Sequence, residues 1–474
     1  MNDIARTGGS GTVGRAPMRA LASWALYDWA AQPFYTLIVT FLFAPYFATA
    51  VVGDPARGQT LWGYGAALAG IVVALSSPLL GAFADEGRRR KPLIGVLSIT
   101  MAAAMAGLWL AVPEAPSSVI WLVLGCFVMA TIAAEFTTVL TNAMMPSLVP
   151  ASELGRLSGI GWAVGYVGGL LSLALMAGLV VAAPGSERTL IGLAPLVDLD
   201  PAAREGDRLV GPFSALWYLV FMIPFFLFVP EVRAAAARSE RTTSAAAELW
   251  RTLKALPADR DMLYFLAARM LYTDGLTAIF AFGGIYGAAV FGWRAIELGL
   301  FGIILNLAGA LGGVAGGWLD DRAGARRVII AALVVLLVAA TGILSVDRDH
   351  ILFGIGVAAK AAGSAPFSSA GEQAFLAFAI LVGLVAAPIQ ASSRSLLARL
   401  APPDKITQYF GLFAFSGKVT AFLAPLLVAA ATQASGSQRI GISVIALFLV
   451  GGIALMLPVR EVSARPDRSI SSSD

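Results

Sequence analysis

Long apolar runs separated by polar loops dominate this chain of 474 residues. A helix needs about 20 mainly apolar residues to cross a membrane, and by that rule we expect twelve spans. The first six lie at residues 20–50, 61–83, 92–112, 119–145, 156–183 and 212–230. The second six lie at residues 261–291, 296–319, 326–346, 372–400, 406–432 and 438–459. The pattern therefore predicts an all-α membrane protein.

A polar connector separates the two groups of six spans. We expect an N-terminal tail, an N-terminal six-helix bundle, the connector, a C-terminal six-helix bundle and a C-terminal tail, at residues 1–19, 20–230, 231–260, 261–459 and 460–474. If both termini lie on one side, the loops of that side carry most of the 33 Lys and Arg residues. Basic loops stay in the cytoplasm, so both tails and the connector are predicted to be cytoplasmic.

Composition excludes several other classes. Hydrophobic residues make up 58% of the chain and charged residues 13%, against roughly 45–50% and 25% in soluble domains. The formal charge of +4 comes from basic residues spread over short loops, so we expect no nucleic-acid partner. Cys126 is the single cysteine and His350 the single histidine, which argues against a disulfide, a histidine metal site or a Ser-His-Asp triad. We expect no enzyme activity and no cofactor.

Several segments occur once in each half. The charged loop 81–91, GAFADEGRRRK, returns at 316–327 as GGWLDDRAGARR. Leu26-Tyr27-Asp28 is similar to Leu271-Tyr272-Thr273-Asp274, and Leu148-Val149-Pro150 with Gly159 is similar to Leu400-Ala401-Pro402 with Gly411. Repeats in the same order imply two halves related by an axis along the membrane normal. In that architecture the substrate site lies between the halves, near the midplane.

Ionisable side chains inside the spans are the candidates for binding substrate or protons, because each costs about 2.5–3.5 kcal/mol on insertion scales. They are Asp28, Glu135, Arg269, Asp274 and Lys418, while Arg394 lies nearer the cytoplasmic end of its span. A buried carboxylate can take up and release a proton during a transport cycle. The alternative is a structural ion pair, for example an aspartate with Lys418 or Arg269.

Asp28 and Asp274 are preferred because helix-breaking residues flank them. Pro33 removes a backbone hydrogen bond after Asp28, and Gly275 follows Asp274. We therefore expect the first and seventh spans to be broken, which is tolerated where helices line a cavity. Aromatic and amide side chains beside the aspartates complete the candidate site: Tyr27, Trp29, Gln32 and Tyr272.

Four segments, at 23–30, 142–162, 269–275 and 390–411, resemble one branch of the major facilitator superfamily. The branch contains bacterial relatives of the fungal autophagy-linked vacuolar amino-acid effluxer. The resemblance extends from the first span to the eleventh. It implies the major facilitator fold, with twelve helices in two six-helix bundles, in a bacterial inner membrane. It also implies that the charged loops act as cytoplasmic latches through Asp85, Arg88, Arg89, Asp320, Arg322, Arg326 and Arg327.

The resulting hypothesis is a monomeric, secondary-active, alternating-access transporter of small polar metabolites, most of all amino acids. Efflux is the direction that the resemblance implies, and protons are the expected coupling ion. Asp28 or Asp274 would bind the substrate amine or a proton, and Arg269 or Lys418 the substrate carboxylate. Small-molecule substrate and membrane lipid are the expected partners.

Two alternatives stay open at this point. The first is a carrier for another solute, such as a sugar, a drug-like amphiphile or a lipid. The second is a non-transporting membrane receptor or assembly factor on the same fold, whose function would survive the loss of Asp28 and Asp274.

Overall fold

The computed structural model describes residues 14–86, 89–182, 186, 188–231, 244–293, 295–360 and 364–461. Helices of the first half are α1 (Met18–Pro33), α2 (Phe43–Tyr46), α3 (Pro55–Asp85), α4 (Arg90–Gly107), α5 (Ser117–Met144), α6 (Leu154–Leu175) and α7 (Glu205–Phe228). The connector contributes α8 (Ala245–Ala255). The second half contains α9 (Arg260–Phe291), α10 (Ala295–Ala323), α11 (Ala325–Leu344), α12 (Ala370–Leu400), α13 (Ile406–Ser416), α14 (Leu423–Ser435) and α15 (Gln438–Met456).

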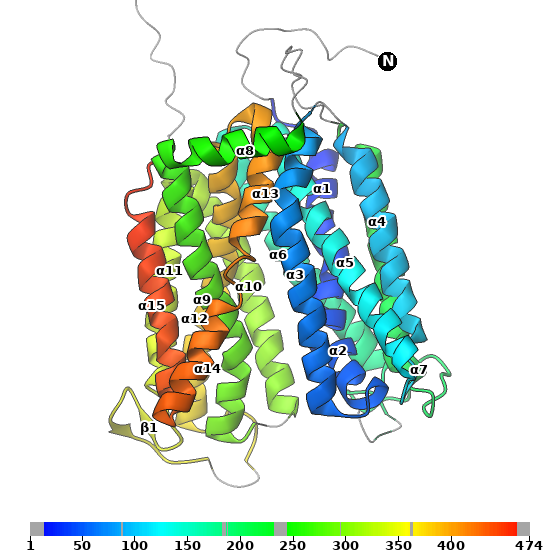
Figure 1. Ribbon diagram of the computed structural model, residues 1–474. Helices are drawn as coiled ribbons and strands as arrows, with labels where there is room; N and C mark the ends of the chain where they lie inside the picture. The colour runs from blue at the N-terminus through cyan, green and yellow to red at the C-terminus, as the bar shows by residue number, and fades with distance from the viewer. Residues whose placement is uncertain are drawn as a thin grey trace, which may run out of the picture.

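The long helices run roughly side by side, with α8 lying across one end of the bundle (Figure 1). The opposite end carries a short hairpin of β1 (His350–Ile351) and β2 (Ile355–Gly356), which pair antiparallel. We call these two ends of the molecule the α8 end and the β1 end.

The predicted spans are found as helices that mostly extend beyond the predicted bounds. Among the described residues, 11 helical segments are long and apolar enough to cross a membrane. The expected eleventh span, 406–432, is divided between α13 and α14, and residues 417–422 form a turn between them (Figure 1). The all-α class is confirmed, and the count agrees with twelve spans when α13 and α14 are taken together.

The two predicted helix breaks have different outcomes. After Pro33 the α-helix gives way to a π-helical stretch, Phe34–Phe41, as expected from the missing N–H of proline. In contrast, α9 runs unbroken through Asp274 and Gly275, so the break predicted there is wrong. A glycine costs a helix only about 1 kcal/mol. An unpaired backbone N–H or C=O group inside a membrane costs several kcal/mol, so the helix continues through Gly275.

Each half has its own hydrophobic core. One cluster of buried apolar side chains comes from residues 21–229, and a second comes mostly from residues 262–459. Val139 and Ala143 of α5 also belong to the second cluster. The halves therefore pack mainly within themselves and meet along a narrower seam, where polar groups and glycines decide the fit.

Two glycines that the repeat relates are points of closest approach across this seam. Gly159 of α6 lies against Gly313 and Gly317 of α10, and a Cβ atom on Gly159 would collide with their backbones. Gly411 of α13 lies in the same way against α3, where the Ser77 hydroxyl donates a hydrogen bond to its carbonyl at 3.0 Å. Small residues let helices approach to this distance.

We predict that Gly159→Val destabilises the folded protein. A Cβ atom at this position would lie 2.8 Å from the Gly317 Cα, and overpacking of a close contact typically costs about 1–3 kcal/mol. Thermal unfolding of the purified protein in detergent should show a lower midpoint. Gly63→Val on α3 is the matched control, because a Cβ atom on Gly63 meets nothing within 4 Å. Equal midpoints for the two variants would show that the seam tolerates separation.

Candidate functional site

A cavity of about 440 Å³ lies between the two halves. We call it the central cavity; α1, α5, α6, α9, α12, α13 and the 417–422 turn contribute to its wall. The predicted site residues that line it are Tyr27, Asp28, Gln32, Glu135, Arg269, Tyr272 and Lys418. Arg394, placed by the sequence nearer the end of its span, also lines it. Trp29 and Asp274 do not.

Arg394 joins the two halves in the wall of the central cavity. It belongs to α12, and its guanidinium lies 3.2 Å from the Asp28 carboxylate of α1. It also donates to the Asn142 side chain of α5 at 3.0 Å and to the Ser158 hydroxyl and carbonyl of α6 at 2.8 and 2.7 Å. Gly161 leaves space for this contact, because a Cβ atom there would lie 2.6 Å from the Asp28 carboxylate.

A second ion pair crosses the central cavity at a more accessible place. Lys418, in the 417–422 turn, lies 2.9 Å from Glu135 of α5. The Lys418 and Glu135 side chains are 35% and 17% exposed, and the Arg394 and Asp28 side chains are 4% and 21% exposed. Both pairs therefore join an acid of the first half to a base of the second, and Lys418 is the more accessible of the two bases.

Arg269 is the remaining cation of the cavity wall. Its guanidinium donates to the Phe413 carbonyl at 2.6 Å and to the Ser416 hydroxyl at 2.9 Å, and it stacks 3.4 Å above the Phe413 ring centroid. No described carboxylate lies within ion-pair distance of it. Arg269 is thus a positive charge that is positioned by α13 but not neutralised.

Asp274 points away from the cavity into the second half. It is 1% exposed, and neither of its carboxylate oxygens has a hydrogen-bond partner among the described residues. The Thr420 hydroxyl lies beside it and is also without a partner. The pairs given as examples, an aspartate with Lys418 or Arg269, are not formed, because Lys418 binds Glu135 and Arg269 binds α13. Asp28 instead forms an ion pair with Arg394.

The aromatic candidates divide into two groups. The Tyr27 hydroxyl bonds to Thr138 of α5 at 2.7 Å, and the Tyr272 hydroxyl bonds to Ser393 of α12 at 2.7 Å. Both rings are held at the cavity wall in this way. Trp29 instead stacks on Trp217 of α7 with ring centroids 5.6 Å apart, which is a packing role inside the first half.

The first charged loop closes the α8 end through a helix terminus. Asp85 accepts hydrogen bonds from the backbone N–H of Thr407 at 3.2 Å and Gln408 at 2.8 Å, in the first turn of α13. A carboxylate at a helix N-terminus satisfies free N–H groups and the helix dipole. Arg90, one position beyond the predicted arginines, makes the ion pair with Asp85 at 3.1 Å. Arg89 is exposed, and Arg88 lies outside the described residues.

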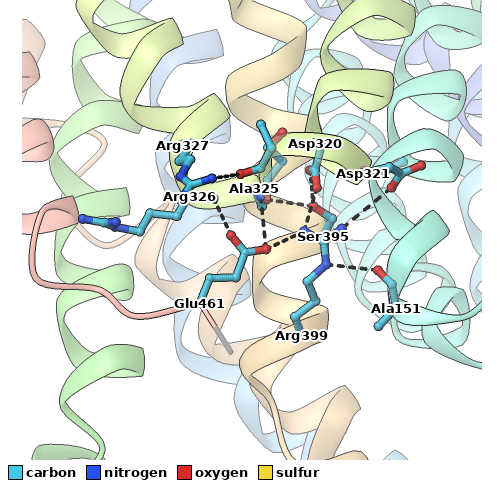
Figure 2. Close-up of polar contacts among 12 residues, drawn as sticks. Ala151, Asp320, Asp321, Ala325, Arg326, Arg327, Ser395, Arg399 and Glu461 are labelled. Atoms are coloured by element: carbon cyan, nitrogen blue, oxygen red, sulfur yellow. Dashed lines mark hydrogen bonds and ion pairs between the residues drawn. The ribbon is translucent and has the colours of Figure 1, made fainter. Parts of the chain in front are cut away.

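The second charged loop makes the equivalent contact through the neighbouring aspartate, Asp321, which Figure 2 shows beside Arg399. Asp321, not Asp320, accepts the backbone N–H of Arg156 in the first turn of α6, at 3.2 Å. Asp320 forms its ion pair within the second half, with Arg399 at 2.6 Å, while its side chain packs against Gly155 of α6. Arg399 also donates to the Ala151 carbonyl of the first half at 3.2 Å.

The other predicted latch residues of this loop contact the second half. Arg322 stacks over Trp318 at 3.7 Å, Arg326 donates to the carbonyls of Met456 and Leu457, and Arg327 donates to the Ala323 carbonyl. Among the described contacts, the link between the halves at this loop is therefore made by Asp321 and Arg399. The latch role expected of Arg322, Arg326 and Arg327 stays a prediction, because their described contacts are within the second half.

We predict that Arg394→Met destabilises the protein more than Lys418→Met. Removing Arg394 leaves Asp28, Asn142 and Ser158 without their buried partner, and breaking such a pair costs roughly 3–5 kcal/mol. Partly exposed ion pairs contribute about 0–1 kcal/mol, so the Lys418 variant should unfold close to wild type. Thermal unfolding in detergent measures the difference. Similar midpoints for the two variants would contradict the assignment of Arg394 as the structural link.

Comparison with known proteins gives the family and the fold of this chain. The family described as "Vacuole effluxer Atg22 like" matches residues 59–469. The MFS-type transporter YxiO of Bacillus subtilis (strain 168), whose name calls it uncharacterized, is 22% identical over 446 residues, which is 93% of this chain and 95% of that protein. Autophagy-related protein 22-1 of Neosartorya fischeri is 25% identical over 318 residues, 64% of this chain and 48% of that protein. This chain thus matches about half the length of that fungal relative.

Among solved structures, the human organic anion transporter MFSD10 (TETRAN) superposes with a TM-score of 0.67 at 14% identity, covering 92% of this chain and 99% of that one. At that identity the likeness establishes the fold, which is that of the major facilitator superfamily. The recognition made from the sequence segments is confirmed.

Proposed function

We propose that this chain, which belongs to the family of Atg22-like vacuole effluxers, is a secondary-active transporter that exports amino acids. Membership of this family of multi-pass transporters is the premise. The substrate, the direction and the coupling ion are our proposal. We further propose that the protein is a monomer in a bacterial inner membrane, with the α8 end in the cytoplasm.

The observation that carries the substrate class is the distribution of charge around the central cavity. Arg269 offers a guanidinium with no carboxylate against it, which suits the carboxylate of a substrate. Lys418, whose neighbour Gly417 lies against Arg269, is paired with Glu135 of the first half, and both side chains are partly exposed. A zwitterion can insert between them, with its ammonium on Glu135 and its carboxylate on Arg269 and Lys418. Each charge of the substrate is then matched.

The described state fits one half of an alternating-access cycle. Polar contacts between the halves gather at the α8 end, through Asp85, Asp321 and Arg399. Helix α8 lies at the same end and is tied to the second half, where Thr252 donates to the Gln408 side chain at 3.2 Å and Glu248 pairs with Lys405 at 2.7 Å. We propose that these contacts release when the cavity opens to the cytoplasm.

A carrier for an organic anion is the second candidate. Arg269 favours it for the same reason as an amino acid, while the acids of the cavity already have partners in Arg394 and Lys418. The two candidates differ in whether the substrate needs an amine. A strongly apolar solute is disfavoured, because five charged side chains line the wall.

The proposal predicts counterflow of labelled amino acids in liposomes that contain the purified protein, and its loss in Arg269→Gln. Without the guanidinium, the substrate carboxylate loses a charge-assisted hydrogen bond of roughly 1.5–3 kcal/mol, so uptake at low substrate should fall at least about tenfold. Arg57→Gln, at an exposed position on α3, is the control and should transport normally.

Competition with two groups of compounds separates the candidates. Amino acids that compete where the matching carboxylates without an amine do not would support the amino-acid carrier. Competition by both alike would favour the organic-anion carrier. Absence of counterflow with every amino acid would sink the amino-acid proposal and leave the family assignment in place.

A further inference from the structure

Asp274 is the one membrane-embedded candidate that neither the cavity nor an ion pair explains. The side chain is 1% exposed, and both of its carboxylate oxygens are without partners. Apolar side chains lie next to it, since Leu449 and Phe448 of α15 lie against the neighbouring Gly275. The charged group that acts on Asp274 is Arg269 on the same helix, and its hydrogen bonds go to α13.

An ionised carboxylate in this setting would be costly. Burying a charge without a partner costs several kcal/mol even after relaxation, and the group takes a proton instead. A neutral carboxylic acid needs one acceptor for its O–H. The Thr420 hydroxyl lies beside Asp274 and has no other partner, so it can accept that hydrogen bond.

The segment that holds Thr420 also reaches the central cavity. Thr420 and Lys418 both belong to the 417–422 turn, where the path of the eleventh span is not helical. Thr420 lies on the Asp274 side, and Lys418 pairs with Glu135 in the cavity. Gly417 in the same turn lies against the Arg269 guanidinium. Thr420, which lies beside Asp274, is therefore only two residues from Lys418, one of the groups that we assign to the substrate.

We propose that Asp274 is the proton site of the transport cycle, outside the substrate cavity, and that the 417–422 turn couples it to Lys418 and Arg269. This rests on the proposed function for its role in transport, but not for the site itself. A proton from water binds the carboxylate and gives a carboxylic acid that donates to the Thr420 hydroxyl. When the turn moves, the proton returns to water and the carboxylate becomes charged again. Asp28, which is paired with Arg394, links the two halves and does not carry the proton.

Infrared difference spectroscopy of the purified protein tests the site without any substrate. A carbonyl stretch of a neutral carboxylic acid should be present in the wild type at neutral pH and absent in Asp274→Asn. In Thr420→Val the band should shift, because the acid loses its acceptor. Asp198→Asn, at an exposed loop position, and Thr100→Val, at a half-buried position on α4, are the matched controls and should leave the band unchanged. A wild-type spectrum that Asp274→Asn does not alter would overturn the proposal.

Transport then tests the coupling. In liposomes, Asp274→Asn should keep counterflow within about twofold of wild type, because exchange needs no net proton movement. Accumulation driven by a pH gradient should fall at least about tenfold. Loss of counterflow as well, in a folded variant, would place Asp274 in the substrate site and overturn the proposal. So would accumulation that follows a sodium gradient and not a pH gradient.

The two proposals fail separately. A wild type without counterflow for any amino acid would count against the proposed substrate, while the infrared band of Asp274 still decides the proton site. A normal wild type with an unchanged band in Asp274→Asn would leave the carrier standing and remove the proton site.

Discussion

A charge inside a membrane needs a partner, and in this protein the partner is usually in the other half of the chain. Arg394 of the second half is held by Asp28, Asn142 and Ser158 of the first. At the α8 end, Asp85 satisfies the free N–H groups of α13 in the same way. Because such groups are expensive to leave unpaired, they hold the halves together in one arrangement. A transporter must nevertheless exchange these contacts to move.

The length of the apolar runs was enough to predict the spans, because membrane thickness sets the helix length. Which charged side chains contact one another was not predictable to the same degree. Asp320 and Asp321 are adjacent in one helix and point about 100° apart, so only the packing of α6 shows which of them accepts its backbone N–H. Arg394 was ranked below the other candidates because it lies near the end of its span, but α12 brings it to Asp28 in the cavity wall. Asp274, whose carboxylate has no partner among the described residues, was preferred because a helix break was expected at Gly275. That reason proved wrong, since α9 is unbroken there.

The repeat extends to contacts that the sequence comparison did not reveal. Glu231 accepts the Arg90 N–H at the start of α4 at 3.0 Å, and Glu461 accepts the Ala325 N–H at the start of α11 at 3.1 Å. Each glutamate follows the last span of its half and caps the third. Arg394 and Asn142, 252 positions apart, bond to each other at equivalent sites. The two halves therefore use the same local chemistry, and their departures from it are informative.

The clearest departure is the 417–422 turn. The spacing that relates Asn142 to Arg394 places it opposite residues 165–170, which lie inside the unbroken helix α6. Gly165 lies against Asp28 and Gly417 against Arg269, so the glycines are kept while the helix is lost. Two identical halves would offer two similar surfaces to the cavity. Because the helix is interrupted in one half only, Lys418 and Thr420 lie in a turn that their counterparts lack, and that turn is the segment through which we propose that substrate and proton are coupled.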